Sequence, residues 1–185
     1  MNIKKSLLDL YRNLNREIYN GTLPPINIRF SFKGKQLKTW TIRHNTPEYN
    51  LIIYWNLLDC EESELYVDML HQMVHIYNDV NGIKDTSRNY RFHNELFAKE
   101  ARRIGLIVER DENGCHTVGL EESLFKRIQG LFDFDEFKKA IITDKPDTSN
   151  AMIVQKCPRC NRVVRTAPSN NLICGFCYCD YISAE

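Results

Sequence analysis

The spacing of apolar residues along the chain switches between the period of an amphipathic helix and that of a half-buried strand. Residues 3–20 repeat apolar positions three and four apart, which predicts a helix that is ended by a glycine and two prolines. Apolar and polar residues alternate at 26–32, and a run rich in β-branched and aromatic residues follows at 49–55. Both segments are predicted strands, and a third strand is expected between them at 37–43.

A longer helix is predicted from residue 61 to about residue 77, because three glutamates fall in its first turn and apolar residues recur behind them. Beyond it the same reasoning predicts, in order, a polar loop at 82–92, a helix at 94–104, a hairpin at 107–118 and short helices near 121–129 and 134–141. Residues 143–150 are polar, contain a proline and show no periodicity, so they are the predicted domain boundary. The chain is thus expected to consist of a domain at 1–142, a linker at 143–150 and a C-terminal module at 151–185.

The overall composition is that of an ordinary soluble protein. Of 185 residues, 43% are hydrophobic and 26% are charged, and the net charge is only +1. A charge this small gives no general attraction to nucleic acid, so such a role needs a local basic patch. The N-terminus lacks the apolar stretch of a signal peptide, and no apolar run is long enough to cross a bilayer. We therefore expect a cytoplasmic protein with reduced cysteines and no membrane partner.

Residues 71–75 read His-Gln-Met-Val-His, one residue away from the zinc-protease signature His-Glu-x-x-His. Histidines four residues apart lie on one face of a helix, where both imidazoles can bind a single zinc ion. A histidine pair of this spacing also occurs in helices without a metal, with its rings facing solvent or packed in the core. In the protease signature the glutamate is the general base, whereas the Gln72 amide cannot take a proton.

A catalytic zinc ion needs three protein ligands and one open position. His93 directly precedes the helix predicted at 94–104, so the preceding loop can bring it back to the metal. His44 and His116 lie in turn-rich or strand segments that offer no comparable geometry. We therefore predict His71, His75 and His93 as the ligands of a catalytic-type zinc, while His93 taken alone would more often be a surface residue.

Four of the seven cysteines form two Cys-x-x-Cys pairs, namely Cys157 with Cys160 and Cys174 with Cys177. Two such pairs predict a structural zinc ribbon with four thiolate ligands, in a module too small to fold easily without a metal. A redox dithiol is the alternative, but it does not explain the second pair. Cys179 competes with Cys177 for the fourth position, and the Cys-x-x-Cys spacing favours Cys177.

Several segments together resemble the SprT-like zinc metalloproteases, the group that includes the Spartan and Wss-type DNA–protein crosslink proteases. The resemblance covers most of the chain and rests on the helix and Leu-Pro exit at 14–24, the histidine helix at 69–78, the segment Asn89–Phe97 and the four-cysteine ribbon. It implies an α+β fold, in which a small zincin-like domain packs a twisted sheet on helices and is followed by the ribbon. It also implies peptide hydrolysis by a zinc-activated water on protein that is bound or crosslinked to DNA, with a sheet edge holding the substrate backbone.

Gln72 departs from this family, which has glutamate there as the general base. General acid–base catalysis contributes about 10²–10⁴-fold to a rate, so we expect zinc to bind and turnover to be lost or strongly impaired. Two explanations compete: an intentional Glu→Gln inactivation, which the protease-like surroundings favour, and a natural relative that binds without cutting. The second makes the chain a non-catalytic, zinc-stabilised module that binds DNA or protein. Hydrolysis of a non-peptide substrate is a weaker third hypothesis.

Three further side chains near the histidines are candidates for supporting roles. Asp68 and Asp79 are candidate hydrogen-bond partners of the imidazoles, with solvated helix carboxylates as the alternative. Tyr90 is a candidate for stabilising an oxyanion, with a packed loop aromatic as the alternative.

Two surfaces are candidates for contact with DNA. In the ribbon, the basic residues outnumber Asp180 and Glu185; they are Lys156, Arg159, Arg162 and Arg165. The predicted hairpin interleaves basic and aromatic residues, namely Arg29, Lys33, Lys35, Lys38 and Arg43 with Phe30, Phe32 and Trp40. A solvated basic surface and the buried face of a hairpin are the respective alternatives.

Overall fold

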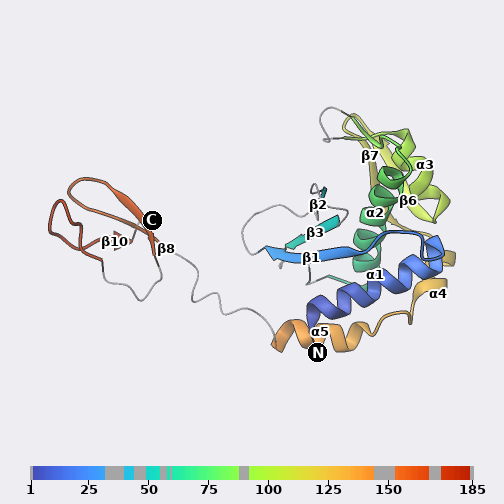
Figure 1. Ribbon diagram of the computed structural model, residues 1–185, viewed down its shortest axis with the longest axis horizontal. Helices are drawn as coiled ribbons and strands as arrows, with labels where there is room; N and C mark the ends of the chain where they lie inside the picture. Colours follow the sequence, from blue (N-terminus) through green and yellow to red (C-terminus); the bar gives the residue numbers. More distant parts are fainter. Residues whose placement is uncertain are drawn as a thin grey trace. The chain divides into compact units, whose positions relative to one another are not determined.

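The computed structural model describes residues 2–31, 40–43, 49–54, 58, 60–87, 92–143, 153–166 and 172–183. The chain divides into two compact units, Met1–Asp144 and Lys145–Glu185. The first unit is α+β, with helices and small sheets, and the second contains short strands (Figure 1). Among the described residues, no helix has the length and apolar character that a membrane crossing requires.

A small mixed sheet occupies one side of the first unit, with its strands in the order β1–β3–β2. The central strand β3 (Tyr49–Tyr54) pairs in parallel with β1 (Ile26–Ser31) and antiparallel with β2 (Trp40–Arg43). Alternation places Ile28 and Leu51, which are partners in the register, on the buried face of the sheet. Both edges of this sheet, β1 and β2, are formed by short strands.

Helix α1 (Ile3–Tyr19) packs against β1 and lies beside α5 (Phe134–Thr143), as Figure 1 shows. It begins where the Asn2 side chain accepts a hydrogen bond from the Lys5 amide at 3.0 Å. It ends at Asn20, whose left-handed φ of 52° closes the helix. The buried face of α1 follows the helical period predicted from the sequence, with Leu7, Leu10 and Leu14 fully buried.

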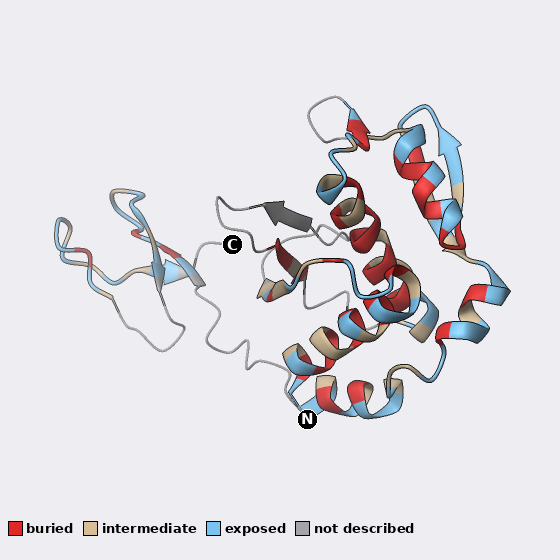
Figure 2. Cartoon of the chain, turned by 45° about the vertical axis from the view of Figure 1, so that its right-hand side comes forward, coloured by how far each residue is buried: buried red, intermediate tan, exposed pale blue. Residues whose placement is uncertain are grey.

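Helix α2 (Glu62–Val80) crosses the middle of the unit and is buried along most of its length (Figure 2). At its start the Glu61 amide donates to the Glu64 carboxylate at 2.8 Å, as in a capping box. It extends beyond the predicted end near residue 77, because Ile76 and Asn78 remain buried against the rest of the unit. Removing a buried side chain such as Leu70 to Ala would cost about 2–5 kcal/mol of stability.

Short elements gather against α2 away from the sheet. They are β4 (Thr86–Ser87), β5 (Phe92–His93), α3 (Glu95–Arg103), β6 (Leu106–Asp111), β7 (Gly114–Leu120) and α4 (Glu122–Ile128). The expectation of a polar loop throughout 82–92 was wrong, since Thr86 pairs with His93 and Ser87 with Phe92. A strand of two residues is too short to show an alternating pattern in the sequence. The hairpin β6–β7 has the predicted turn, with a bulge at Ile107/Val108.

The second unit contains an antiparallel sheet with the order β10–β8–β9. Its strands are β8 (Ile153–Lys156), β9 (Val163–Thr166) and β10 (Ile182–Ser183). In the described part of this unit, the buried side chains are Gln155, Cys157 and Cys174. Such a set cannot supply an apolar core, so the cysteine cluster itself must hold the unit together.

Candidate metal centres

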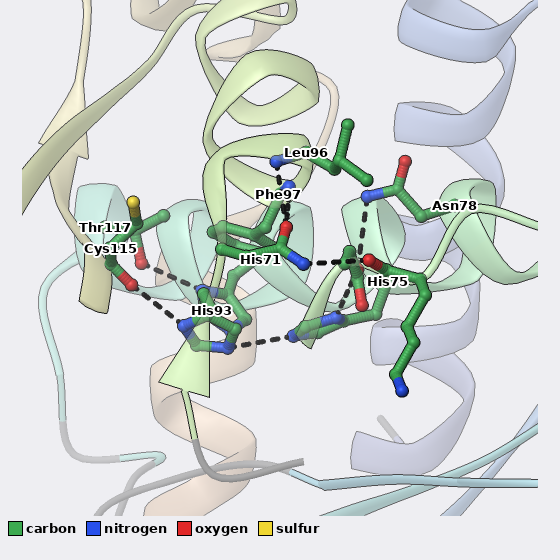
Figure 3. A network of polar contacts seen from close by, with 11 residues as sticks. His71, His75, Asn78, His93, Leu96, Phe97, Cys115 and Thr117 are labelled. Atoms are coloured by element: carbon green, nitrogen blue, oxygen red, sulfur yellow. Dashed lines mark hydrogen bonds and ion pairs between the residues drawn. The ribbon is translucent and has the colours of Figure 1, made fainter. Parts of the chain in front are cut away.

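The structure brings together the three histidines that the sequence singles out. His71 and His75 lie one turn apart on α2, and His93 ends β5, which returns towards the same helix face (Figure 3). One ligand atom from each histidine lies within 4.8 Å of the other two. The Nε2 atoms of His75 and His93 are 3.1 Å apart. Nitrogen ligands at about 2.0–2.1 Å around a tetrahedral zinc are separated by about 3.3 Å, so this spacing fits one ion.

Each ring uses its Nδ1 atom for a contact with the protein. His93 Nδ1 donates to the Cys115 carbonyl oxygen at 3.0 Å, and His75 Nδ1 donates to the Asp85 carboxylate at 2.7 Å. His71 Nδ1 shares a hydrogen bond with the Thr117 hydroxyl at 2.9 Å. With Nδ1 donating to these acceptors, the Nε2 atoms of His75 and His93 face each other. Two lone pairs at this distance repel unless a proton or a metal cation lies between them, so the arrangement is compatible with a metal site.

Asp85 is the carboxylate that orients His75, and the sequence analysis did not find it. The side chain is buried and also accepts a hydrogen bond from the Asn78 amide at 3.1 Å. The sequence-based candidates, Asp68 and Asp79, are placed differently: Asp79 accepts from the Tyr49 hydroxyl, and Asp68 lines a small cavity on the sheet side of α2. The available clue was an acidic residue in the loop between His75 and His93, in reach of both.

Phe97 forms the apolar floor of the histidine cluster. Its ring centroid lies 4.8 Å from that of His71, 4.9 Å from that of His75 and 4.2 Å from that of His93. The side chain is fully buried. An aromatic wall of this kind keeps water away from one side of the rings and fixes their orientation. Phe97 lies four residues after His93, in the first turn of α3, so the start of this helix brings its ring back to the histidine.

Gln72 is buried on α2, with 5% of its surface exposed, on the side that faces the sheet. It lines a cavity of about 20 Å³ together with apolar residues of α1, β3 and α2, and with Asp68 one turn earlier. Burial, together with the negative charge of Glu64, raises the pKa of Asp68 to about 6. The Gln72 amide can donate and accept hydrogen bonds, but it cannot remove a proton from a water molecule.

An open groove of about 440 Å³ adjoins His93. Its walls come from the start of α3 and from the tip of the β6–β7 hairpin, including Glu95, Arg110 and Glu112. Arg110 and Glu95 form an ion pair at 2.6 Å across this groove. Gly114, beside the turn of the hairpin, has a φ of +106°, and a Cβ there would lie 2.6 Å from the His93 carbonyl oxygen. Glycine at this position therefore lets the hairpin approach His93 closely.

The four cysteines of the two Cys-x-x-Cys pairs also come together, all within 4.8 Å of one another. The Cys160 and Cys174 sulfurs are 3.7 Å apart, close to the value of about 3.8 Å for two thiolates on one tetrahedral zinc. The backbone N–H of Cys160 lowers the pKa of the Cys157 thiol to about 6, whereas burial raises the pKa of Cys177 to about 12. Four adjacent sulfurs thus need a cation to become thiolates together, which fits a metal site.

The remaining candidates from the sequence lie partly outside and partly within the described residues. Tyr90, Phe32, Lys33, Lys35 and Lys38 lie outside the described residues, as do the side chains of Trp40 and Arg43. Arg29 is exposed on β1, and Phe30 is partly buried against the core. In the ribbon, Phe176 and Tyr178 are exposed, and the Arg162 guanidinium lies 4.7 Å from the centre of the Phe176 ring.

Comparison of the chain with models of known protein families, with curated proteins and with solved structures found no match. The two clusters, one of three histidines and one of four cysteines, can each hold a metal ion. Their chemistry is therefore the basis on which a function is proposed.

Proposed function

We propose that the first unit is a zinc metallopeptidase scaffold of the SprT-like, zincin-like type, acting on DNA-associated or DNA-crosslinked protein, in which Gln72 replaces the general base. The observation that carries this proposal is the convergence of three histidines, with the Nε2 atoms of His75 and His93 3.1 Å apart and Nδ1 of both rings held by the protein. Three neutral imidazoles suit zinc and leave one coordination position for water or substrate.

His71, His75 and His93 would hold the zinc, which when bound supplies a Lewis acid for a water molecule or a peptide carbonyl. Asp85, Thr117 and the Cys115 carbonyl would keep the rings in position, and Phe97 would exclude water beneath them. A glutamate at position 72 could accept the proton of an attacking water and pass it to the leaving amine. Gln72 has the shape of that glutamate without its basicity, so this chain is expected to be inactive or nearly so.

An extended peptide substrate could pair with an edge of the first sheet. Strand β2 forms an edge of the first sheet and also contacts α2. A substrate strand added to that edge would be held by its backbone, which gives binding with little dependence on side chains. The groove beside His93 would add a second, polar surface next to the cluster.

The ribbon supports a role for DNA in placing the substrate. Phe176 is 69% and Tyr178 is 84% exposed, and Arg162 stacks against Phe176. Exposed aromatic rings among basic residues are suited to stacking on bases and contacting phosphates. Binding that weakens steeply with increasing salt would support this role.

The competing proposal is a non-catalytic module in which both zinc ions stabilise a surface for DNA or protein. The specific observation in its favour is Gln72 itself, buried and in place of the base. Metal content does not separate the two proposals, because both require occupied sites.

The test is cleavage of a DNA-bound protein by the zinc-loaded chain and by its Gln72→Glu variant, each with and without DNA. We expect the Gln72→Glu variant alone to cut, with a rate about 10²–10⁴-fold above that of the original chain. The matched control carries Gln72→Glu together with His93→Gln, which removes one ligand and should abolish the gained activity. If Gln72→Glu gains nothing, the metallopeptidase proposal fails and the binding module is favoured.

A further inference from the structure

We propose that Cys179 is a reserve ligand of the ribbon's metal site and takes the place of Cys177 when that thiolate is lost. This inference rests on the metal-binding role proposed for the ribbon. It concerns a fifth thiol, beyond the four that lie mutually within 4.8 Å. The exchange needs no oxidant: the departing sulfur takes up a proton, and the Cys179 thiol releases one as it binds the metal.

Cys179 is already at a ligand-like distance from one member of the cluster, Cys157. Its sulfur lies 3.6 Å from that of Cys157, compared with 3.7 Å between Cys160 and Cys174 inside the cluster. Two thiolates bound to one tetrahedral zinc are about 3.8 Å apart. A small rotation of its side chain, without a change of fold, would therefore bring Cys179 to the metal.

The two cysteine turns have the same backbone hydrogen bonds, and this equivalence explains why Cys179 is held there. In the first turn, Cys157 N donates to Arg162 O at 2.8 Å; in the second, Cys174 N donates to Cys179 O at 2.9 Å. Arg162 and Cys179 thus occupy equivalent positions, five residues after the first cysteine of each pair. Arg162 is exposed, whereas Cys179 is half-buried and carries a sulfur that can bind a metal.

The present ligand, Cys177, is held by a strained turn. Tyr178, which follows it, has a left-handed φ of 53°, and the equivalent residue of the first turn is Asn161 with a φ of 61°. Asparagine tolerates this conformation, but a bulky aromatic residue does so only at a cost. Because Cys177 and Cys179 flank Tyr178, an exchange between them rearranges one turn and leaves the first cysteine pair untouched.

The test uses the full chain loaded with Co²⁺ in place of zinc. The near-ultraviolet charge-transfer absorption of Co²⁺ grows with the number of bound thiolates, and the histidine cluster contributes none. The wild-type chain should show four thiolates; absence of this signal would overturn the metal-binding role of the ribbon itself. Two double variants with equal numbers of cysteines are then compared: Cys177→Ser with Cys60→Ser, and Cys177→Ser with Cys179→Ser.

We expect the Cys177/Cys60 variant to keep the wild-type absorption, because Cys179 supplies the fourth thiolate. The absorption of the Cys177/Cys179 variant should fall to about three quarters of the wild-type value, since three thiolates remain. The inference is overturned if the absorption of both variants falls equally, if both variants keep the full absorption, or if the Cys177/Cys60 variant shows no thiolate charge-transfer absorption. These outcomes leave the wild-type result standing, so a failure of the exchange is distinguishable from a failure of the ribbon site.

Discussion

The Asp85 carboxylate accepts a hydrogen bond from Nδ1 of His75 at 2.7 Å, which ties the loop after α2 to a candidate ligand on that helix. Asp85 also receives the Asn78 side-chain amide at 3.1 Å, and its carbonyl oxygen accepts from the Asn94 backbone N–H at 2.9 Å. Asn94 is the N-cap of α3 and directly follows His93. One buried residue therefore orients His75 and also positions the segment that carries His93.

Asp85→Asn should lower the zinc affinity of the histidine cluster about 10–100-fold, because an amide is a weaker acceptor for the His75 N–H. Zinc titration followed through the histidine-ring NMR signals would measure this site separately from the ribbon. The matched control is Asp79→Asn, which changes a carboxylate on α2 that accepts from Tyr49. Equal zinc affinities for Asp85→Asn and the original chain would contradict this role.

Gly114→Ala should displace His93 and weaken zinc binding at the histidine cluster by tenfold or more, because the new Cβ would lie 2.6 Å from the His93 carbonyl oxygen. Gly82→Ala is the control, since Gly82 also has a positive φ but nothing lies within 4 Å of its added Cβ. Both changes should cost about 1–2 kcal/mol through backbone strain. Thermal unfolding measures the backbone strain that both variants share, and zinc titration measures the effect of the contact with His93. A similar loss of zinc affinity in both variants would disprove the role of this contact.

Asp68→Asn should stabilise the first unit increasingly as the pH rises from about 4 to about 6. The pKa of Asp68 is raised from 3.8 to about 6 by burial and by Glu64, so the native state resists its ionisation. That penalty is absent below pH 3.8 and complete above about pH 6, where it amounts to about 1–3 kcal/mol. Chemical unfolding at pH 4 and pH 7 would measure the difference. The control is Asp9→Asn, which replaces a partly exposed carboxylate on α1.

Removing metal with a chelator should unfold the ribbon and leave the first unit folded. The ribbon buries Cys157 and Cys174 but little apolar surface among its described residues, so its folding depends on the metal. The first unit keeps the core formed by α1, α2 and the sheet. The backbone amides of residues 153–166 and 172–183 should therefore lose their protection from hydrogen exchange, while those of α1 and α2 remain protected. If the ribbon amides stay protected after the metal is removed, interactions other than metal binding stabilise its fold.

The sequence predicted those features that depend on local spacing. The helical period places His71 and His75 on one face of α2, and the two Cys-x-x-Cys pairs fall into one cluster. His93 was predicted because a polar loop and a following helix could return it to the metal, and because His44 and His116 offered no comparable geometry. The strands β1 and β3 were also predicted, but their parallel pairing was not, because alternation gives no information on which strands are neighbours.

The partners of the histidines could not be predicted in the same way. Thr117 and the Cys115 carbonyl lie on β7, far along the chain from the residues they contact. Their roles depend on how the hairpin packs against α2, which no local pattern specifies. Asp85 was missed for a different reason: Asp68 and Asp79 lie on the helix itself, and proximity in sequence was a poorer guide than position in the returning loop.

Strand β7 makes hydrogen bonds to two of the three histidines, to His71 through Thr117 and to His93 through the Cys115 carbonyl. The histidine cluster is therefore complete only after β7 has packed against α2. The contact between His71 and Thr117 closes a span of 46 residues, whereas His71 and His75 become neighbours as soon as α2 forms. Contacts across long spans form slowly, because the chain between them must first be ordered. A nascent chain would therefore offer a metal ion only the pair His71 and His75, and tight binding at the proposed site would require the hairpin to have docked.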